Sequence, residues 1–484
     1  MVTTFNYFSS RGIRVLRIKR LSNLFFLLMG ITALISCSSE KKDKDEAVNK
    51  TEAFPSTYRT ILSDPFVIEH ATILTGTGKQ LEDASILVEN GKIKLVGQGF
   101  YVDPKTKRFD ANGKWVTPGI IDVHSHLGVY PSPSIESTQD GNEMTNPVTA
   151  EVWAEHSVWT QDPGMQLALA GGVTTFQVLP GSGNLIGGRG VTLKNVFARS
   201  VQGMKFPDAP HSLKMACGEN PKRVYGKKSR APSTRMGNVA GYRAAWIKAE
   251  AYREKWDKYY ESLGSEKEKD KPKRDLQLDT LAEVLRGNIL VHNHCYRAEE
   301  MLVMIDIAKE FDYEIAAFHH AIEAYKVADV LAKENICAAV WADWWGFKHE
   351  AFDHVKENAA MVDNAKACAI IHSDSAIGIQ HLNQETAKAM AAGNKNGLKL
   401  EPKDAIAWIT SNAAKSIGID DRTGTLEENK MADIVIWSHN PFSIYAKAEK
   451  VFIDGALMYD RNDTNKQPVS DFDLGITDPT GERL

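Results

Sequence analysis

Apolar residues recur in short runs along this chain, and the character of the runs changes from one region to the next. From Phe66 to Gly99 the runs are rich in β-branched residues and are separated by the turn sequences TGTGK and ENGK. Such runs predict strands joined by tight turns. The segments GTLEENKMADIVIWSHNPF and KAEKVFIDGALMYD, near the other end, show the same pattern of short strand-like runs separated by turns. We therefore expect residues 63–116 and 421–462 to form one small composite β-sandwich domain.

Residues 117–420 alternate strand-like apolar runs with helical stretches. Runs such as NILVHNH and ICAAVWAD are interspersed with amphipathic stretches such as AEEMLVMIDIAKEF, and repeated βα units predict a parallel sheet. Chemically active side chains stand at the ends of many successive strands, which favours a (β/α)8 barrel of the TIM type over a doubly wound sheet. A charged insertion at residues 227–275 is predicted to be helical, either as a lid over the barrel mouth or as a solvated surface helix.

The first 37 residues have the order of a secretory signal, with a cationic lead followed by the apolar run LSNLFFLLMGITALIS. This run is shorter than the roughly 20 apolar residues that span a bilayer. Because LISC, ending at Cys37, resembles the lipobox of bacterial lipoproteins, we expect cleavage before Cys37 and lipidation of its thiol. Residues 38–62 are polar and predict a flexible tether. The protein would then be exported and anchored to the cell envelope, at the outer membrane, facing the periplasm or the surface.

Length and composition narrow the function classes. A chain of 484 residues suits one large catalytic domain with an accessory module. With 58 basic and 62 acidic residues and a net charge of -4, the chain lacks the basic excess of a nucleic-acid binder, so nucleic acid is not an expected partner. The cysteines beyond Cys37 do not show the spacing of a disulfide framework, and we expect free thiols. They are Cys217, Cys295, Cys337 and Cys368.

Two histidines stand one residue apart in VTPGIIDVHSHLG. Side chains alternate across a strand, so His124 and His126 face the same side and can reach one metal ion from the end of a strand. Taken alone, the pair is more typical of hydrogen-bonded core histidines than of metal ligands.

Several further motifs favour the metal site. The sequences PGIIDVHSHLG, HNHCYRAEE, AAFHHAIEA, IIHSDSA, WITSNAAKSIGI and GTLEENKMADIVIW, in this order, resemble the amidohydrolase superfamily, in particular its imidazolonepropionase- and prolidase-like branch. The likeness spans about Phe66 to Asp454. It implies a distorted barrel with a β-sandwich made from both chain ends, and a divalent metal cofactor with one or two ions per chain. Zinc is the expected metal, although nitrogen and oxygen ligands also suit manganese, iron and cobalt.

The resemblance also implies a set of metal ligands. The histidines that match are His124, His126, His294 and His320. Neighbouring residues on a strand face opposite ways, so His292 and His319 are the alternatives if the register differs by one or two residues.

Asp374, in the sequence HSD, matches the aspartate that contacts metal and transfers the proton of the attacking water. A helix cap is its alternative role. For the bridging ligand the family uses a carboxylated lysine or a glutamate at the end of the fourth strand, and SLKMACGENPKR offers Lys214 and Glu219. We favour Glu219, because Lys214 would lie about 17 Å further down a strand that ran to Gly218.

Substrate contacts are expected from Tyr296, which could polarise the scissile carbonyl, and from Arg297, which could pair with a substrate carboxylate or with a nearby glutamate. His292 is a further candidate for binding substrate or stabilising the oxyanion. Trp344 and Trp345 could line an apolar pocket or pack in the core.

The predicted function is therefore hydrolysis of an amide or peptide-like C–N bond in a small molecule by metal-activated water, with Asp374 as general base and acid. A deaminase or cyclic amidine or imide hydrolase on the same scaffold is one alternative. A non-catalytic, ligand-binding surface lipoprotein is the other.

Overall fold

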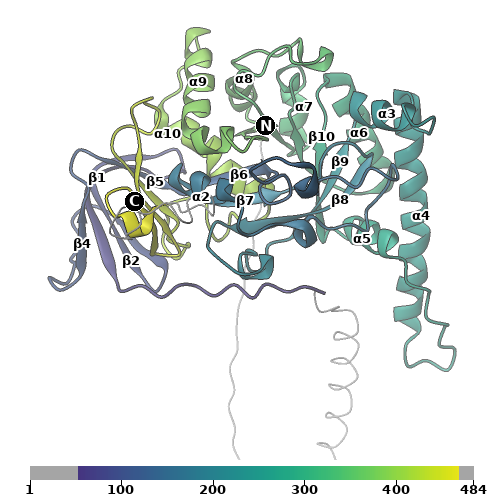
Figure 1. Ribbon diagram of the computed structural model, residues 1–484, viewed down its shortest axis with the longest axis horizontal. Helices are drawn as coiled ribbons and strands as arrows, with labels where there is room; N and C mark the ends of the chain where they lie inside the picture. Colours follow the sequence, from purple (N-terminus) through teal and green to yellow (C-terminus); the bar gives the residue numbers. More distant parts are fainter. Residues whose placement is uncertain (1–52, 468–484) are drawn as a thin grey trace, which may run out of the picture. The chain divides into compact units, whose positions relative to one another are not determined.

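The computed structural model describes residues 53–467 (Figure 1). The predicted signal segment, Cys37 and most of the predicted tether lie outside the described residues. Within the described part, none of the helices combines the length and apolar character needed to cross a bilayer.

One sheet joins the two ends of the chain. Its strands run in the order β16-β15-β14-β5-β1-β2-β3, with β4 beside β1. In Figure 1 the purple N-terminal strands and the yellow C-terminal strands lie side by side, where β5 and β14 pair antiparallel. The strands are β1 Phe66–Leu74, β2 Gln80–Glu89, β3 Lys92–Gly97, β4 Lys107–Asp110, β5 Trp115–Pro118, β14 Ile434–Trp437, β15 Ala448–Ile453 and β16 Ala456–Asp460.

The strand-rich segments predicted near the two ends of the chain pair in one sheet. Phe66 of β1 stacks on Phe452 of β15 with 4.9 Å between ring centroids, and both are buried. Of the described residues, 54–258 and 270–467 form one compact unit, so a separate sandwich domain stays a prediction.

The second sheet is a nearly closed barrel of eight strands in the order β13-β12-β11-β10-β9-β8-β7-β6. Its edges meet where the backbone N–H of Asp374, just beyond β13, donates to the carbonyl of His124 on β6 at 3.0 Å. The strands are β6 Ile120–Ser125, β7 Val173–Val178, β8 Ile186–Lys194, β9 His211–Ala216, β10 Ile289–His294, β11 Ile315–His319, β12 Cys337–Val340 and β13 Cys368–Ile371.

The barrel departs from the predicted regular (β/α)8 pattern at β8. This strand is antiparallel to both β7 and β9, whereas the other neighbouring pairs are parallel. No helix separates β7 from β8, and a short connection between neighbouring strands forces them to run in opposite directions. The fold is therefore an α/β barrel with one inverted strand.

Helices follow the later strands and pack through one apolar face. In α6, Met301, Met304, Ile305 and Ala308 are buried at helical spacing, which lays this face on the barrel. The helices are α2 Pro163–Ala170, α3 Glu219–Gly226, α4 Arg235–Ser262, α5 Leu276–Leu285, α6 Ala298–Phe311, α7 Ala328–Lys333, α8 Asn358–Asn364, α9 Leu382–Lys395, α10 Pro402–Ala405 and α11 Ser411–Ser416.

The insertion at residues 227–275 contains α4, as the sequence predicted. Trp246 of this helix is fully buried, and its ring centroid lies 4.5 Å from that of Tyr313. One face of α4 therefore packs against the barrel instead of being solvated all round.

The expectation of free thiols is wrong for the four described cysteines. They form the disulfides Cys217–Cys295 and Cys337–Cys368. Cys337 and Cys368 are register partners on the neighbouring strands β12 and β13, and Cys217 and Cys295 directly follow the neighbouring strands β9 and β10. Sequence spacing alone does not show which strands are neighbours, so it could not indicate these pairs.

Candidate active site

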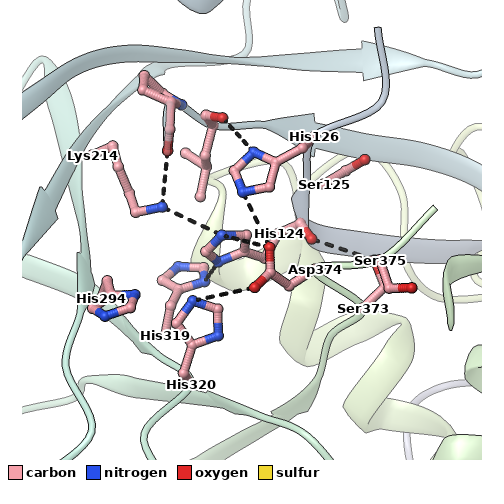
Figure 2. A network of polar contacts seen from close by, with 12 residues as sticks. His124, Ser125, His126, Lys214, His294, His319, His320, Ser373, Asp374 and Ser375 are labelled. Atoms are coloured by element: carbon pink, nitrogen blue, oxygen red, sulfur yellow. Dashed lines mark hydrogen bonds and ion pairs between the residues drawn. The ribbon is translucent and has the colours of Figure 1, made fainter. Parts of the chain in front are cut away.

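The carboxyl end of β6 directs both predicted histidines at one carboxylate (Figure 2). The Nε2 atoms of His124 and His126 lie 3.7 and 3.1 Å from Oδ1 of Asp374. Nδ1 of His126 lies 2.8 Å from the carbonyl oxygen of Leu179. A carbonyl can only accept, so Nδ1 of His126 carries a hydrogen, and Nε2 is the nitrogen directed at Asp374. A metal that took the place of this contact would have Nε2 as its ligand atom.

Asp374 occupies the centre of the cluster. Its other oxygen, Oδ2, lies 3.8 Å from Nε2 of His320. Burial raises the pKa of Asp374, but the hydrogen bond and charge of His126 outweigh this effect and hold the pKa below its ordinary value. The carboxylate is therefore ionised, which suits both a metal ligand and a proton acceptor.

His372 belongs to the cluster although it is not among the residues predicted from the sequence. Nitrogen atoms of His124, His320 and His372 lie within 4.8 Å of one another. His372 is fully buried, and neither of its ring nitrogens has a hydrogen-bond partner among residues 53–467. It stands two residues before Asp374, the same spacing as His124 and His126. The alternation rule that identified the first pair could therefore have identified this one.

His294, the last residue of β10, lies beside the cluster. Its ring centroid is 4.7 Å from that of His320 and 4.8 Å from that of Tyr296. Burial, reinforced by the charge of Lys348, holds the pKa of His294 well below its usual range, so the ring is neutral. Its Nδ1 atom has no hydrogen-bond partner in the described part of the chain.

The side chains present fit a divalent cation. Two groups have donor atoms within 4.8 Å of one another, namely His124 with His320 and His372, and His124 with His126 and Asp374. Burial lowers the pKa of each of the three buried histidines, which keeps their lone pairs available. Buried polar atoms without partners are costly unless a ligand satisfies them. Imidazole and carboxylate donors of this kind are typical of zinc sites.

Behind His124 lies a series of buried imidazoles. Nδ1 of His124 is 2.9 Å from Nδ1 of His319, and Nε2 of His319 is 2.8 Å from Nδ1 of His292. If Nε2 of His124 binds a metal, its Nδ1 must donate to His319, which must then carry its own hydrogen on Nε2 and donate to His292. His319, one of the two alternative ligands predicted from the sequence, therefore contacts the site through His124. His292, the other alternative, is connected to His124 through His319.

The structure brings Lys214, not Glu219, next to the histidines. Nζ of Lys214 lies 3.3 Å from Nε2 of His124 and donates to the carbonyl of Pro180 at 2.9 Å. Burial lowers the pKa of Lys214 to about 7. The expectation that Lys214 lies far down the strand fails because β9 ends at Ala216, only two residues beyond it.

Glu219 has a different position. It is the first residue of α3, and its carboxylate lies 3.6 Å from Nζ of Lys348. It lines a cavity of about 450 Å³ that also reaches Asp374 and His294. The side chains that line the cavity are Ser182, Glu219, Asn220, Arg223, His294, Tyr296, Trp341, Trp344, Phe347, Lys348 and Asp374.

Among the predicted substrate contacts, Tyr296 lines the cavity, and burial raises its pKa well above the usual range, so the phenol keeps its proton. Arg297 instead forms an ion pair with Glu299 at 2.6 Å, the alternative that the sequence left open. Trp344 lines the cavity, whereas Trp345 donates through Nε1 to the carbonyl of Phe352 at 2.8 Å.

Histidines and a carboxylate gathered at the carboxyl ends of barrel strands define a protein of the metal-binding α/β-barrel class. The family model described as the amidohydrolase family matches residues 115–458. The chain belongs to the amidohydrolase family.

Three similar proteins were identified. Amidohydrolase tasK of Hapsidospora irregularis is 31% identical over 431 residues, which cover 82% of this chain but 43% of tasK. This chain thus spans less than half the length of that relative. A crystal structure of an amidohydrolase from Thermotoga maritima MSB8 matches with a TM-score of 0.75 and 34% identity, covering 82% of this chain and 100% of the other. A 5-methylthioadenosine/S-adenosylhomocysteine deaminase of Symbiobacterium thermophilum is 21% identical, over 81% of this chain and 93% of its own.

Proposed function

We propose that the protein is a metal-dependent hydrolase that cleaves an amide or peptide-like C–N bond in a small molecule. The observation that carries this proposal is the ionised Asp374 beside His124, His126 and His320, at the inner end of an open cavity. A divalent metal held by these residues, for which we propose zinc, would lower the pKa of its water towards about 7 and polarise the substrate carbonyl.

The protein's own groups supply the proton transfers. Asp374 accepts one proton from the attacking water and delivers it to the leaving nitrogen, so that the amine departs neutral and the carboxylate is restored. The protonated phenol of Tyr296 can donate a hydrogen bond to the carbonyl oxygen as negative charge develops there. The buried rings around Asp374 exclude bulk water, which strengthens both interactions.

We propose Lys214 rather than Glu219 as the bridging ligand. The support is position, since Lys214 Nζ is 3.3 Å from His124 Nε2 while the Glu219 carboxylate is held by Lys348. Addition of carbon dioxide to the neutral amine forms a carbamate and releases one proton. We expect Lys214→Ala to lose bound metal and Glu219→Gln to keep it, and a carbamate carbon to be seen by NMR after incubation with 13C-bicarbonate in the wild type but not in Lys214→Ala.

The test of the function is metal content together with turnover. Elemental mass spectrometry on the full chain, purified without chelator, should give one or two metals per chain. Turnover is then screened with dipeptides and N-acyl amino acids. Asp374→Asn should abolish turnover while metal stays bound, and Glu310→Gln, an exposed carboxylate paired with Arg243, serves as the control. Normal turnover in Asp374→Asn rejects the role of this carboxylate.

Two other outcomes decide between the alternatives. Release of ammonia from amidines or aminated rings, with no cleavage of amides, would identify a deaminase. A chain that binds no metal even after reconstitution would be a ligand-binding module.

We also propose that Cys37 carries a lipid and anchors the protein to the cell envelope, where the outer membrane is the proposed location. The signal-like sequence before Cys37 supports this proposal, and so do the two disulfides, because disulfides persist mainly in exported proteins. Wild-type protein should partition into the detergent phase of Triton X-114, and Cys37→Ser should not. Equal partitioning of the two would reject lipidation.

A further inference from the structure

One wall of the cavity is built from aromatic rings. Trp341, Trp344 and Phe347 follow β12, and Tyr296 follows β10. The rings of Trp341 and Trp344 stack with 4.8 Å between centroids and 6° between planes. Phe347 meets each of these two rings at 87°. Three rings that support one another in this way form a preorganised aromatic surface.

This wall leads from the metal-capable cluster to the cavity mouth. Trp341 stacks on the candidate ligand His320 with 4.3 Å between centroids. The exposed fraction rises from 3% at Trp341 to 37% at Trp344 and 53% at Phe347. Exposed aromatic surface beside a cleft is typical of ligand contact. A group lying on Trp344 is therefore held close to the reacting atoms.

The charges around the cavity leave one cation free. Lys348 lies 3.6 Å from the centre of the Tyr296 ring, and its charge is balanced by Glu219 and Glu350, each 3.6 Å from Nζ. Arg223, on α3, also lines the cavity and is exposed. Among residues 53–467 no carboxylate forms an ion pair with Arg223. A free guanidinium is suited to bidentate pairing with a carboxylate.

We propose that the substrate combines an aromatic side chain with a free carboxylate, as in an N-acyl aromatic amino acid or a dipeptide with an aromatic residue. The aromatic group packs on Trp344 and Phe347, and the carboxylate pairs with Arg223. This inference rests on the proposed hydrolase function for the cleaved bond, while its statement about binding does not depend on cleavage.

The first test measures kcat/KM of the metal-loaded protein for N-acetylphenylalanine, N-acetylalanine and N-acetylphenylalanine amide. Wild type should prefer the phenylalanine compound to the alanine compound by about tenfold or more, and Trp344→Ala should lose most of this preference. Trp345→Ala is the matched control, because Trp345 is 60% exposed but does not line the cavity. Arg223→Gln should raise KM about tenfold for the free acid and leave the amide unchanged.

The second test measures binding without turnover. Quenching of tryptophan fluorescence by N-acetylphenylalanine is titrated in Asp374→Asn, alone and combined with Trp344→Ala or Arg223→Gln. If no amide is cleaved but binding weakens in both double variants, the hydrolase function is wrong and the ligand class stands. If amides are cleaved without preference for an aromatic side chain, or if Trp344→Ala and Trp345→Ala behave alike, the ligand class is overturned while the hydrolase function stands.

Discussion

Replacing His319 tests whether the buried imidazoles behind His124 set its metal-binding tautomer. In His319→Phe the ring volume is kept but the acceptor, 2.9 Å from His124 Nδ1, is lost. Without metal, His124 can move its hydrogen to Nε2, so the apo protein loses little. With metal on Nε2, the Nδ1 hydrogen stays buried and unpaired, which costs about 1–3 kcal/mol. Because only the metal-bound form is destabilised, the metal affinity of His319→Phe should be about 10- to 100-fold lower than that of the wild type.

The assay is competition for metal with a fluorescent chelator, combined with thermal unfolding of the apo form. His319→Asn is the rescue variant, because the amide oxygen of Asn can take the place of Nδ1 as acceptor. His354→Phe is the control for the loss of a buried histidine elsewhere, where Nε2 lies 3.3 Å from the Ala342 carbonyl. Wild-type affinity in His319→Phe, or equal losses in the Phe and Asn variants, would refute the tautomer argument.

Three further predictions concern stability. Asp454→Asn should lower the free energy of unfolding by about 3 kcal/mol or more, because it removes a carboxylate 2.8 Å from the fully buried Lys194; chemical denaturation measures this. Replacing Cys217 and Cys295 together with serine should cost about 2–4 kcal/mol, and an unchanged transition would contradict the disulfide. Burial lowers the pKa of His354, so its neutral form is favoured in the folded state, and the stability it contributes is lost as pH falls below about 6.5. Unfolding of the wild type should therefore depend more steeply on pH near that value than unfolding of His354→Gln.

Part of the site follows from one rule of strand geometry, applied at strand ends. Residues two apart on a strand face the same side, which predicts the pair at His124 and His126, whereas Asp374 is predicted by the family resemblance. The preference for Glu219 came from placing the end of β9 two residues too late, since the strand ends at Ala216 and not at Gly218. Element boundaries are the least certain part of a sequence pattern. A shift of two residues was enough to exchange the side chain that contacts His124.

Other features could not be predicted from local sequence patterns because they depend on which strands become neighbours. Predicting that β8 is inverted requires knowing that the connection from β7 is short. Predicting the disulfide Cys337–Cys368 requires knowing that β12 and β13 are neighbours in the barrel. Local patterns specify each strand, while sheet order is set by packing between distant segments. The alternation of strand-like and helical stretches predicts the barrel, and the family resemblance adds most of the candidate ligands, but neither indicates these departures from regularity.

The alternation rule predicts that the neighbours His319 and His320 cannot both be metal ligands. In the structure His319 contacts His124 Nδ1, whereas His320 faces Asp374. β11 ends at His319, and His320 has φ +63°, in the left-handed region. Asp374 has φ +49° just beyond β13. For residues other than glycine this region costs on the order of 1–2 kcal/mol. The barrel thus holds two strained residues at the ends of its strands, where the turn out of the sheet points their side chains inward at the same cluster.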